Sequence, residues 1–195
     1  MSTQPRKREV PAPEAAPAPA SRAPRAVLAL SCALYLLLGA WYALAIPFGQ
    51  APDESAHLPY VAYLSEQKKL PVFHGEKRGS YEFHQPPLFY AAAAPVYAAF
   101  RHWSAHIPVR LFNVVLGLGV VILTWRLVGE VFPHEPWLAS GTAAFVALLP
   151  MHVALAASVT NDILSEALFA AVLWTCARAM RRGWTWTMAA AAGLL

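Results

Sequence analysis

The chain has 195 residues, of which 57% are hydrophobic and only 13% charged, and its formal net charge is +4. Soluble domains carry about 25% charged residues, and the apolar residues here form long runs. This pattern excludes a disordered protein, a soluble Rossmann-type enzyme and a nucleic-acid-binding module. Cys32 and Cys176 lie far apart inside apolar runs, so they provide neither a disulfide framework nor a cysteine zinc site.

Residues 1–25 form a tail rich in proline and alanine, with five basic residues against two acidic ones. This composition offers too little apolar surface for folding and predicts a disordered tail. Positive charge beside a span favours the cytoplasmic side, so we expect the N-terminus inside and the protein in the cytoplasmic (inner) membrane. A nucleic-acid-binding arm is the alternative interpretation of these charges.

Residues 26–46 are almost entirely apolar and long enough, as a helix, to cross a bilayer. Trp41 and Tyr42 near the end of this run suit the membrane interface. Ala43-Leu44-Ala45 resembles a signal-peptide cleavage site, but the apolar run is longer than that of a signal peptide. We therefore predict a retained first transmembrane helix.

Residues 47–109 are predicted to form an extracytoplasmic loop with short helices. Their first part, residues 47–86, contains five of the 11 acidic residues and three of the seven histidines. The apolar run that follows, residues 87–100, has Pro95 in its middle. Its length is typical of an interfacial, re-entrant or buried helix rather than of a span.

Residues 110–195 are predicted to supply the remaining transmembrane helices, at 110–129, 137–159 and 163–180. The last apolar segment, residues 184–195, is too short to cross a bilayer. We therefore expect the last helix to be incomplete and the chain to be part of a longer protein.

Two topologies are compatible with these segments. If residues 87–103 cross the membrane, the arginine cluster at 178–182 lies outside, against the positive-inside tendency. If they form a short outer helix, this cluster and Arg126 lie inside, and Asp162 shares the outer face with Asp53. We prefer the second topology, which predicts an all-α polytopic membrane protein with about four spans and a short helical loop on the outer face.

The motif PDESAHLPY, residues 52–60, is the first group of side chains suited to chemistry. Asp53 is expected to cap a helix on which His57 and Tyr60 follow along one face. A carboxylate beside a second acid, Glu54, and an imidazole can act as a general base or hold a divalent cation. A plain helix cap with a surface histidine explains the same spacing.

The motif YEFHQPPLFY, residues 81–90, is the second group. Pro87 suits the start of a helix, which would leave Glu82, His84 and Gln85 at the membrane face. The aromatic residues around them suit either a groove for a sugar or the aromatic belt of the interface.

The third group is Thr160-Asn161-Asp162, with Glu166 one helical turn later. Ionisable residues at the end of a span are costly and indicate a functional site. A helix cap formed by Asn161 or Asp162 is the structural alternative. In the preferred topology all three groups lie on one side of the membrane.

Four segments follow the first span in order: PDESAHLPYVAYLSEQKKLP, EFHQPPLFYAAAAP, VRLFNVVLGLGVVILTWRLVG and ALLPMHVALAASVTNDIL. Their order is similar to that in the N-terminal part of the GT-C superfamily of polytopic glycosyltransferases. The chain resembles in particular the bacterial protein O-mannosyltransferases and lipid A aminoarabinose transferases, with their family 39 and rhizobial lipopolysaccharide transferase-like domains. The resemblance covers roughly residues 26–182, and the Asp-Glu pair combined with His-x-Pro-Pro makes it specific.

The resemblance implies an inverting transfer of a sugar from a polyprenyl-phosphate donor to an acceptor hydroxyl on a lipid, glycan or protein. The reaction would take place outside the cytoplasmic membrane, among membrane lipids. Asp53 would be the general base, Glu54 its paired acid and Asp162 a second acidic site. The position of His84 binds a divalent metal in some relatives.

Phosphate is a good leaving group, so this chemistry needs mainly a positioned base and cations around the phosphate. The candidate cations are Lys68, Lys69, Lys77, Arg78 and Arg110. The expected substrate-binding residues are His57, Tyr60, Glu82, His84 and Gln85.

The chain also departs from the family pattern. Some relatives carry Glu-Lys before the proline where this chain has His84-Gln85, which leaves phosphate pairing and the metal open at that place. Family members continue through more spans that form much of the donor groove, so we expect this chain alone to be inactive. A non-enzymatic or inactive membrane subunit is the alternative, favoured by the small number of spans.

Overall fold

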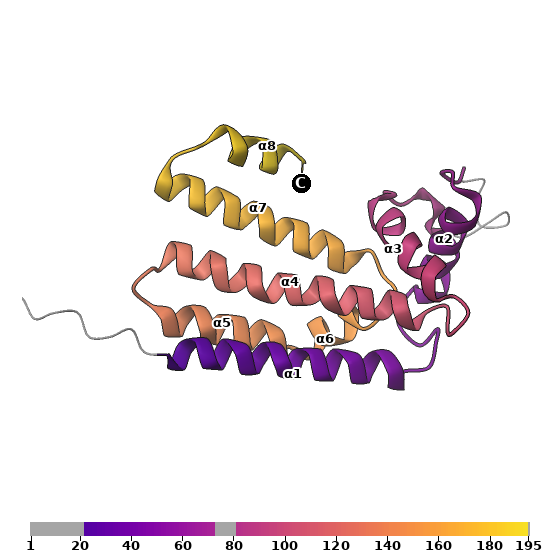
Figure 1. Cartoon of the computed structure of the whole chain (residues 1–195), viewed down its shortest axis with the longest axis horizontal. Helices are drawn as coiled ribbons and strands as arrows, with labels where there is room; N and C mark the ends of the chain where they lie inside the picture. Colours follow the sequence, from indigo (N-terminus) through magenta and orange to yellow (C-terminus); the bar gives the residue numbers. More distant parts are fainter. Residues whose placement is uncertain (1–21, 73–80, 195) are drawn as a thin grey trace, which may run out of the picture.

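The computed structural model describes residues 22–72 and 81–194, and every regular element in these ranges is helical (Figure 1). The elements are α1 (Ala23–Ala45), α2 (Glu54–Gln67), η2 (Tyr81–His84), α3 (Leu88–Phe100), α4 (Ile107–Val131), α5 (Pro136–Leu148), α6 (Pro150–Ala156), α7 (Asp162–Arg182) and α8 (Trp186–Leu194). Most of the tail expected at 1–25 lies outside the described residues, as do Lys77 and Arg78.

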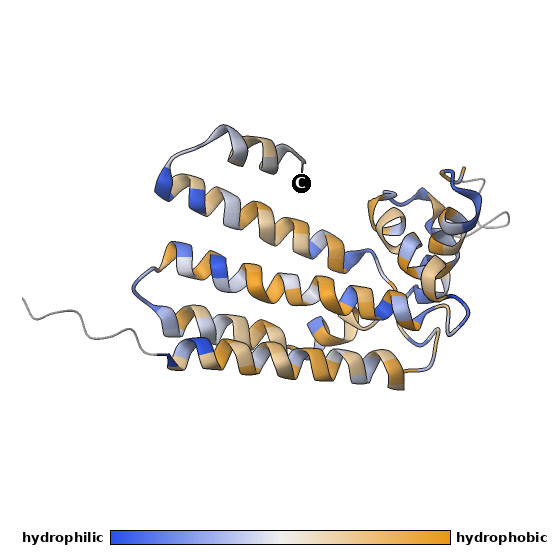
Figure 2. Cartoon of the chain, viewed as in Figure 1, coloured by the Kyte–Doolittle hydropathy of each residue, from blue (hydrophilic) through white to orange (hydrophobic). Residues whose placement is uncertain are grey.

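The long helices α1, α4, α5 and α7 run side by side (Figure 1). Helices α1, α4 and α7 are each long and apolar enough to cross a membrane, and α5 with α6 forms a fourth, broken candidate span. Figure 2 shows apolar residues along these helices and hydrophilic residues near their ends. The prediction of an all-α membrane protein with about four spans is confirmed.

The fourth span differs from a simple helix because α5 and α6 meet at an angle of 59°. Leu149 has an extended backbone, with φ −67° and ψ 117°. The ring of Pro150 disfavours a helical conformation of the preceding residue, and proline donates no backbone hydrogen bond. The predicted span 137–159 is therefore divided at Pro150.

Helices α2 and α3 pack against each other at the end of the bundle where α1 ends and α4 and α7 begin (Figure 1). The short α3 therefore belongs to the helical loop at this end. The opposite end holds the start of α1, the end of α4 and the end of α7. Arg126 and the cluster at 178–182 lie toward that opposite end, as the preferred topology predicts, whereas Asp53 and Asp162 lie at the end with α2.

The centre of the bundle depends on a close approach between α1 and α4. Tyr35 is fully buried and donates a hydrogen bond from its hydroxyl to the carbonyl of Val114 over 3.1 Å. A Cβ atom at Gly117 would overlap this hydroxyl and would lie 3.0 Å from the Cβ of Ala156. Only glycine leaves room for the tyrosine at this crossing.

We expect Gly117→Ala to lower the free energy of unfolding by about 1–3 kcal/mol, because overpacking forces the buried Tyr35 or the neighbouring helix to move. Thermal unfolding in detergent micelles measures this change. Gly119→Ala is the matched control, since a Cβ there meets no atom within 4 Å. Equal stability of the two variants would contradict the close approach.

Candidate functional site

The candidate site is built around Asp53, at the start of α2. The helix begins at Glu54, directly after Asp53, but the Asp53 side chain forms no capping hydrogen bond. Asp53 has φ 55° and ψ 3°, which is the left-handed region, and its side chain is exposed. Aspartate adopts this region more readily than most residues, yet such a backbone still costs free energy and is frequent at functional sites. The carboxylate is thus presented to solvent.

Glu54, the residue after Asp53, forms a buried ion pair with Arg110 of α4. Arg110 donates from Nε to Oε1 and from Nη2 to Oε2 of Glu54, both over 2.6 Å. The exposed fraction of the side chain is 0% for Glu54 and 1% for Arg110. Two parallel charge-assisted hydrogen bonds of this kind fix the relative orientation of the two side chains and also stabilise the pair.

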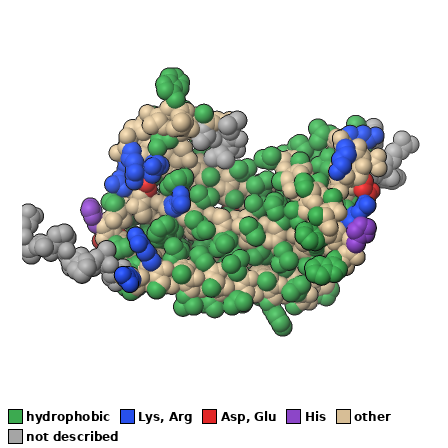
Figure 3. Space-filling view, in the orientation of Figure 1, with side chains coloured by type: hydrophobic (Ala, Val, Ile, Leu, Met, Phe, Trp, Pro, Cys, Tyr) green, Lys and Arg blue, Asp and Glu red, His purple; other side chains and the backbone are tan. Residues whose placement is uncertain are grey.

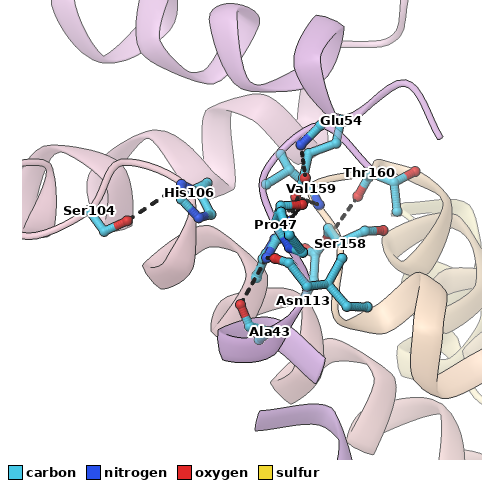
Figure 4. Close-up of polar contacts among 12 residues, drawn as sticks. Ala43, Pro47, Glu54, Ser104, His106, Asn113, Ser158, Val159 and Thr160 are labelled. Atoms are coloured by element: carbon cyan, nitrogen blue, oxygen red, sulfur yellow. Dashed lines mark hydrogen bonds and ion pairs between the residues drawn. The ribbon is translucent and has the colours of Figure 1, made fainter. Parts of the chain in front are cut away.

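This ion pair also joins four segments of the chain (Figure 4). Arg110 donates from Nη1 to the carbonyls of Ala43, over 2.9 Å, and Ile46, over 2.7 Å, at the end of α1. Glu54 accepts from the backbone N–H of Gly49 and of Val159, each over 3.1 Å. We name the pair and these backbone contacts the Glu54–Arg110 clamp.

The clamp determines the ionisation of Glu54. Burial alone would raise its pKa, but the hydrogen bonds from Arg110, Gly49 and Val159 and the charge of Arg110 hold the pKa below its ordinary value of 4.5. Arg110, expected among the cations for a phosphate, is instead occupied by Glu54 and backbone carbonyls. Within this structure, both side chains hold the loop that carries Asp53.

The loop before α7 is held from α4. The Asn113 side-chain amide donates to the carbonyls of Ser158, over 2.8 Å, and Thr160, over 2.9 Å. Figure 4 shows Asn113 among the residues of this loop. The same loop gives the N–H of Val159 to the clamp, so the position of the exposed Asp162 is tied to that of Asp53.

Aromatic side chains form the wall between α2 and α3. The His57 ring nitrogen Nδ1 lies 2.8 Å from the hydroxyl of Tyr90, and the rings of Tyr60 and Tyr90 stack with centroids 3.8 Å apart. Phe83 packs edge-on against Tyr60. His57, Tyr60 and Tyr90 are all buried, so they pack between α2 and α3 and have little contact with solvent.

Three acidic residues act on His57 from different elements. Burial lowers the pKa of His57 below its ordinary 6.5, and the charges of Glu82, Asp162 and Asp53 oppose this shift. Glu82 comes from η2, Asp162 from the start of α7 and Asp53 from the start of α2. The three predicted groups are therefore brought around one histidine.

This lowered pKa predicts that acid destabilises the fold. Between the pKa values of the folded and unfolded states the unfolded chain binds more protons, so stability falls as the pH drops below 6.5. We expect His57→Gln to remove this part of the slope in thermal unfolding measured from pH 8 to pH 5. His134→Gln, at an exposed histidine, is the matched control for the substitution; an unchanged slope in His57→Gln would contradict the prediction.

Gln85 connects the second predicted group to the third. His84 donates from Nδ1 to the carbonyl of Tyr81 over 2.6 Å, which leaves its Nε2 as an acceptor. The amide of Gln85 donates to this Nε2 over 3.4 Å, and its oxygen accepts from Asn161 over 3.5 Å. His84 is exposed and Glu82 is buried. The end of η2 thus lies against the start of α7.

A divalent metal is not supported by the side chains that the structure describes. In residues 22–72 and 81–194, no three His, Cys, Asp or Glu side chains gather closely enough to hold a metal ion. At His84 one ring nitrogen is used by a carbonyl and the other by Gln85.

The pairing of Glu54 with Arg110 was not predicted from the sequence, and Glu166 was grouped with Asp162 although Glu166 lies away from the site. The clamp was missed because Glu54 and Arg110 are 56 positions apart in the sequence, although an arginine opening an apolar run is a signal for a buried partner. Glu166 belongs elsewhere: its carboxylate lies 3.3 Å from His152 Nδ1, and His152 Nε2 lies 3.2 Å from the carbonyl of Gly117 inside the bundle.

Comparison with known proteins identifies the family. No curated protein and no solved structure matched the chain. The family model described as dolichyl-phosphate-mannose-protein mannosyltransferase matches residues 84–194, which include His84, Gln85 and Asp162 but begin after Asp53. The match covers more than half of the chain and confirms the resemblance to GT-C glycosyltransferases. The chain thus belongs to the dolichyl-phosphate-mannose-protein mannosyltransferase family of membrane glycosyltransferases.

Proposed function

We propose that the chain is a glycosyltransferase, or the N-terminal portion of one, that transfers a sugar from a polyprenyl-phosphate donor to an acceptor hydroxyl, with Asp53 as the general base. The observation that carries this proposal is the exposed Asp53 carboxylate, held in a left-handed backbone directly before the buried Glu54. A base on a rigid support needs little reorganisation during the reaction. The family match, which begins after Asp53, supports the glycosyltransferase class.

In the proposed reaction, Asp53 takes the proton of the acceptor hydroxyl as its oxygen attacks the anomeric carbon. The bond from this carbon to the phosphate oxygen breaks, and polyprenyl phosphate leaves with the bonding electron pair, which inverts the configuration. An exposed carboxylate is suited to accept this proton as a general base. Asp162 would form the opposite acidic wall of the same site.

Glu54 is assigned a positioning role in this proposal. Its carboxylate oxygens are occupied by Arg110 and two backbone N–H groups, so it holds the base instead of contacting the substrate. The cations left for the phosphate among the described candidates are Lys68 and Lys69, which are exposed at the end of α2. His57 and Tyr60 from α2, and Glu82, His84 and Gln85 around η2, are proposed to form the sugar-binding wall.

An apolar cavity of about 440 Å³ lies at the same end of the bundle. It is lined by Leu44 of α1, Val96 and Phe100 of α3, and Ile107 and Leu111 of α4. An apolar cavity beside a polar site suits a donor with a hydrocarbon chain and a phosphate head. We propose that the polyprenyl part of the donor lies there.

The proposed orientation follows from charge. The end of the bundle away from Asp53 carries Arg25 of α1, Arg126 of α4 and the cluster 178–182 of α7, and the positive-inside tendency assigns that end to the cytoplasm. The site would then face the outside of the cytoplasmic membrane. The acceptor, whether lipid, glycan or protein, would be met on that side.

The test is a transfer assay with the full-length gene product in membrane vesicles. A polyprenyl-phosphate sugar carrying a radiolabel should give a labelled acceptor, whereas the same sugar on a nucleotide should not. The matched comparison is Asp53→Asn in the same full-length product at equal protein level. Transfer from the nucleotide donor, or no transfer from any lipid-linked sugar by the folded full-length product, would overturn the proposal.

A further inference from the structure

A second cavity lies at the basic end of the bundle, away from the candidate site. Its volume is about 480 Å³, and its walls come from the start of α1, the last turns of α4, the start of α5 and the second half of α7. Figure 3 shows Lys and Arg side chains gathered over these ends of α1 and α7, next to a band of apolar surface. The cavity therefore lies where charged and apolar surfaces meet.

The lining of this cavity is strongly positive. It includes four arginines and a single acidic residue, Glu130. The Glu130 carboxylate forms ion pairs with Arg182 over 2.9 Å, with Arg178 of the lining over 3.6 Å and with Arg181 over 3.8 Å. Of the lining arginines only Arg178 is paired with Glu130, so the lining keeps an excess of positive charge. The four arginines are Arg22, Arg25, Arg126 and Arg178.

Two of these guanidinium groups are held in place by an aromatic ring. Arg126 and Arg178 lie over the ring of Trp174, with 5.4 Å and 5.8 Å to its centroid. A cation over a tryptophan face is stabilised electrostatically but keeps its N–H donors. Arg22, Arg25 and Arg126 form no ion pair with any carboxylate of the residues that the structure describes.

A buried hydroxyl provides an independent sign of a ligand. Ser140 lines the cavity and is 0% exposed, and its Oγ has no hydrogen-bond partner within the described part of the chain. Buried hydroxyls almost always have a partner, because an unsatisfied one costs free energy. An oxygen acceptor in the cavity would complete this group.

We propose that this cavity binds the phosphate headgroup of an anionic phospholipid. Phosphate oxygens accept several charge-assisted hydrogen bonds, which suits a lining that combines guanidinium groups with the unpaired Ser140 hydroxyl. Basic pockets between transmembrane helices are suitable sites for anionic lipid headgroups. The adjoining apolar band would contact the acyl chains. This site is separate from the one proposed for sugar transfer.

The test measures thermal stability of the full chain in detergent micelles with added lipid. Phosphatidylglycerol should give a saturable stabilisation, whereas phosphatidylcholine and inorganic phosphate should not. Arg126→Gln should weaken the apparent affinity for phosphatidylglycerol by about 10-fold, since it removes charge-assisted hydrogen bonds. Arg101→Gln is the control, because it removes the same charge from an exposed side chain that neither lines the cavity nor contacts Glu130.

A second variant tests the cavity without removing charge. Gly129 lines the cavity, and a Cβ built there meets no atom within 4 Å. Gly129→Leu should therefore fold, fill the space and abolish the lipid-dependent stabilisation. Equal stabilisation of Gly129→Leu, Arg126→Gln and the wild type would overturn the proposal in favour of general attraction to the basic surface. Equal stabilisation by inorganic phosphate would overturn the assignment to a lipid.

Discussion

Glu54→Gln is expected to lower the free energy of unfolding by about 3–5 kcal/mol, because it leaves the buried guanidinium of Arg110 without its counter-charge. Arg110→Met should lower the free energy of unfolding by a similar amount, because it leaves the buried carboxylate of Glu54 without its counter-charge. The double variant should be more stable than the sum of the two single changes predicts, since neither charge remains buried alone. Chemical or thermal unfolding in detergent micelles gives all four free energies of the cycle.

The exposed ion pair between Glu66 and Arg101 provides the control. Its atoms are 3.9 Å apart and both side chains are 47% exposed, so Glu66→Gln should change stability by less than about 0.5 kcal/mol.

The effect of Glu54→Gln on the free energy of unfolding should also decline in acid. The pKa of Glu54 is lowered, so its contribution is complete above pH 4.5 and is lost as the pH falls through the lowered value. If the effects of Glu54→Gln and Arg110→Met on the free energy of unfolding simply added in the double variant, the ion pair would contribute no coupling energy to stability.

Asp53→Asn is expected to reduce sugar transfer by about 10²–10⁴-fold, the usual contribution of a general base. Asparagine tolerates the left-handed backbone almost as well as aspartate, so the fold and the membrane insertion should be retained. Asp53→Gly should behave in the same way, because glycine adopts φ 55° without strain. Initial rates of transfer at equal protein level, together with thermal unfolding, provide the comparison.

Two further variants separate the carboxylate from the backbone. Asp53→Ala keeps neither the carboxylate nor the tolerance for this backbone, and it should lose both activity and about 1 kcal/mol of stability. Ser55→Ala, at the exposed position two residues later, should leave both unchanged. Full activity of Asp53→Gly or Asp53→Asn would rule out Asp53 as the base and reduce its role to the turn.

The long elements could be predicted from the sequence because their signal is local. The runs at 26–46, 110–129 and 163–180 lie within α1, α4 and α7 to within a few residues, because length and apolar content alone indicate a span. The 59° bend between α5 and α6 was not predicted. Proline in a transmembrane run permits several outcomes, and the neighbouring helices decide among them.

The candidate site was less predictable because its geometry is tertiary. The sequence indicated that Asp53, His84 and Asp162 lie on one side, but it counted Arg110 among five candidate cations for a phosphate and gave no partner to Asn113. Pairing Glu54 with Arg110 requires the relative position of α2 and α4, which no local pattern contains. The expected cap also differs in detail, since the helix begins after Asp53 without using its side chain.

The Glu54–Arg110 clamp has a consequence for biogenesis. A membrane protein inserts its spans in chain order, and the clamp draws its contacts from the end of α1, from α2, from α4 and from the backbone at Val159. The charged side chains of Glu54 and Arg110 can meet once α4 has entered the membrane. The hydrogen bond from the Val159 N–H to Glu54 can form only after α5 and α6 have also been inserted. Asp53 therefore reaches its final geometry only after the third span in chain order, α5 with α6, is in place, so a nascent chain with fewer spans carries no assembled site.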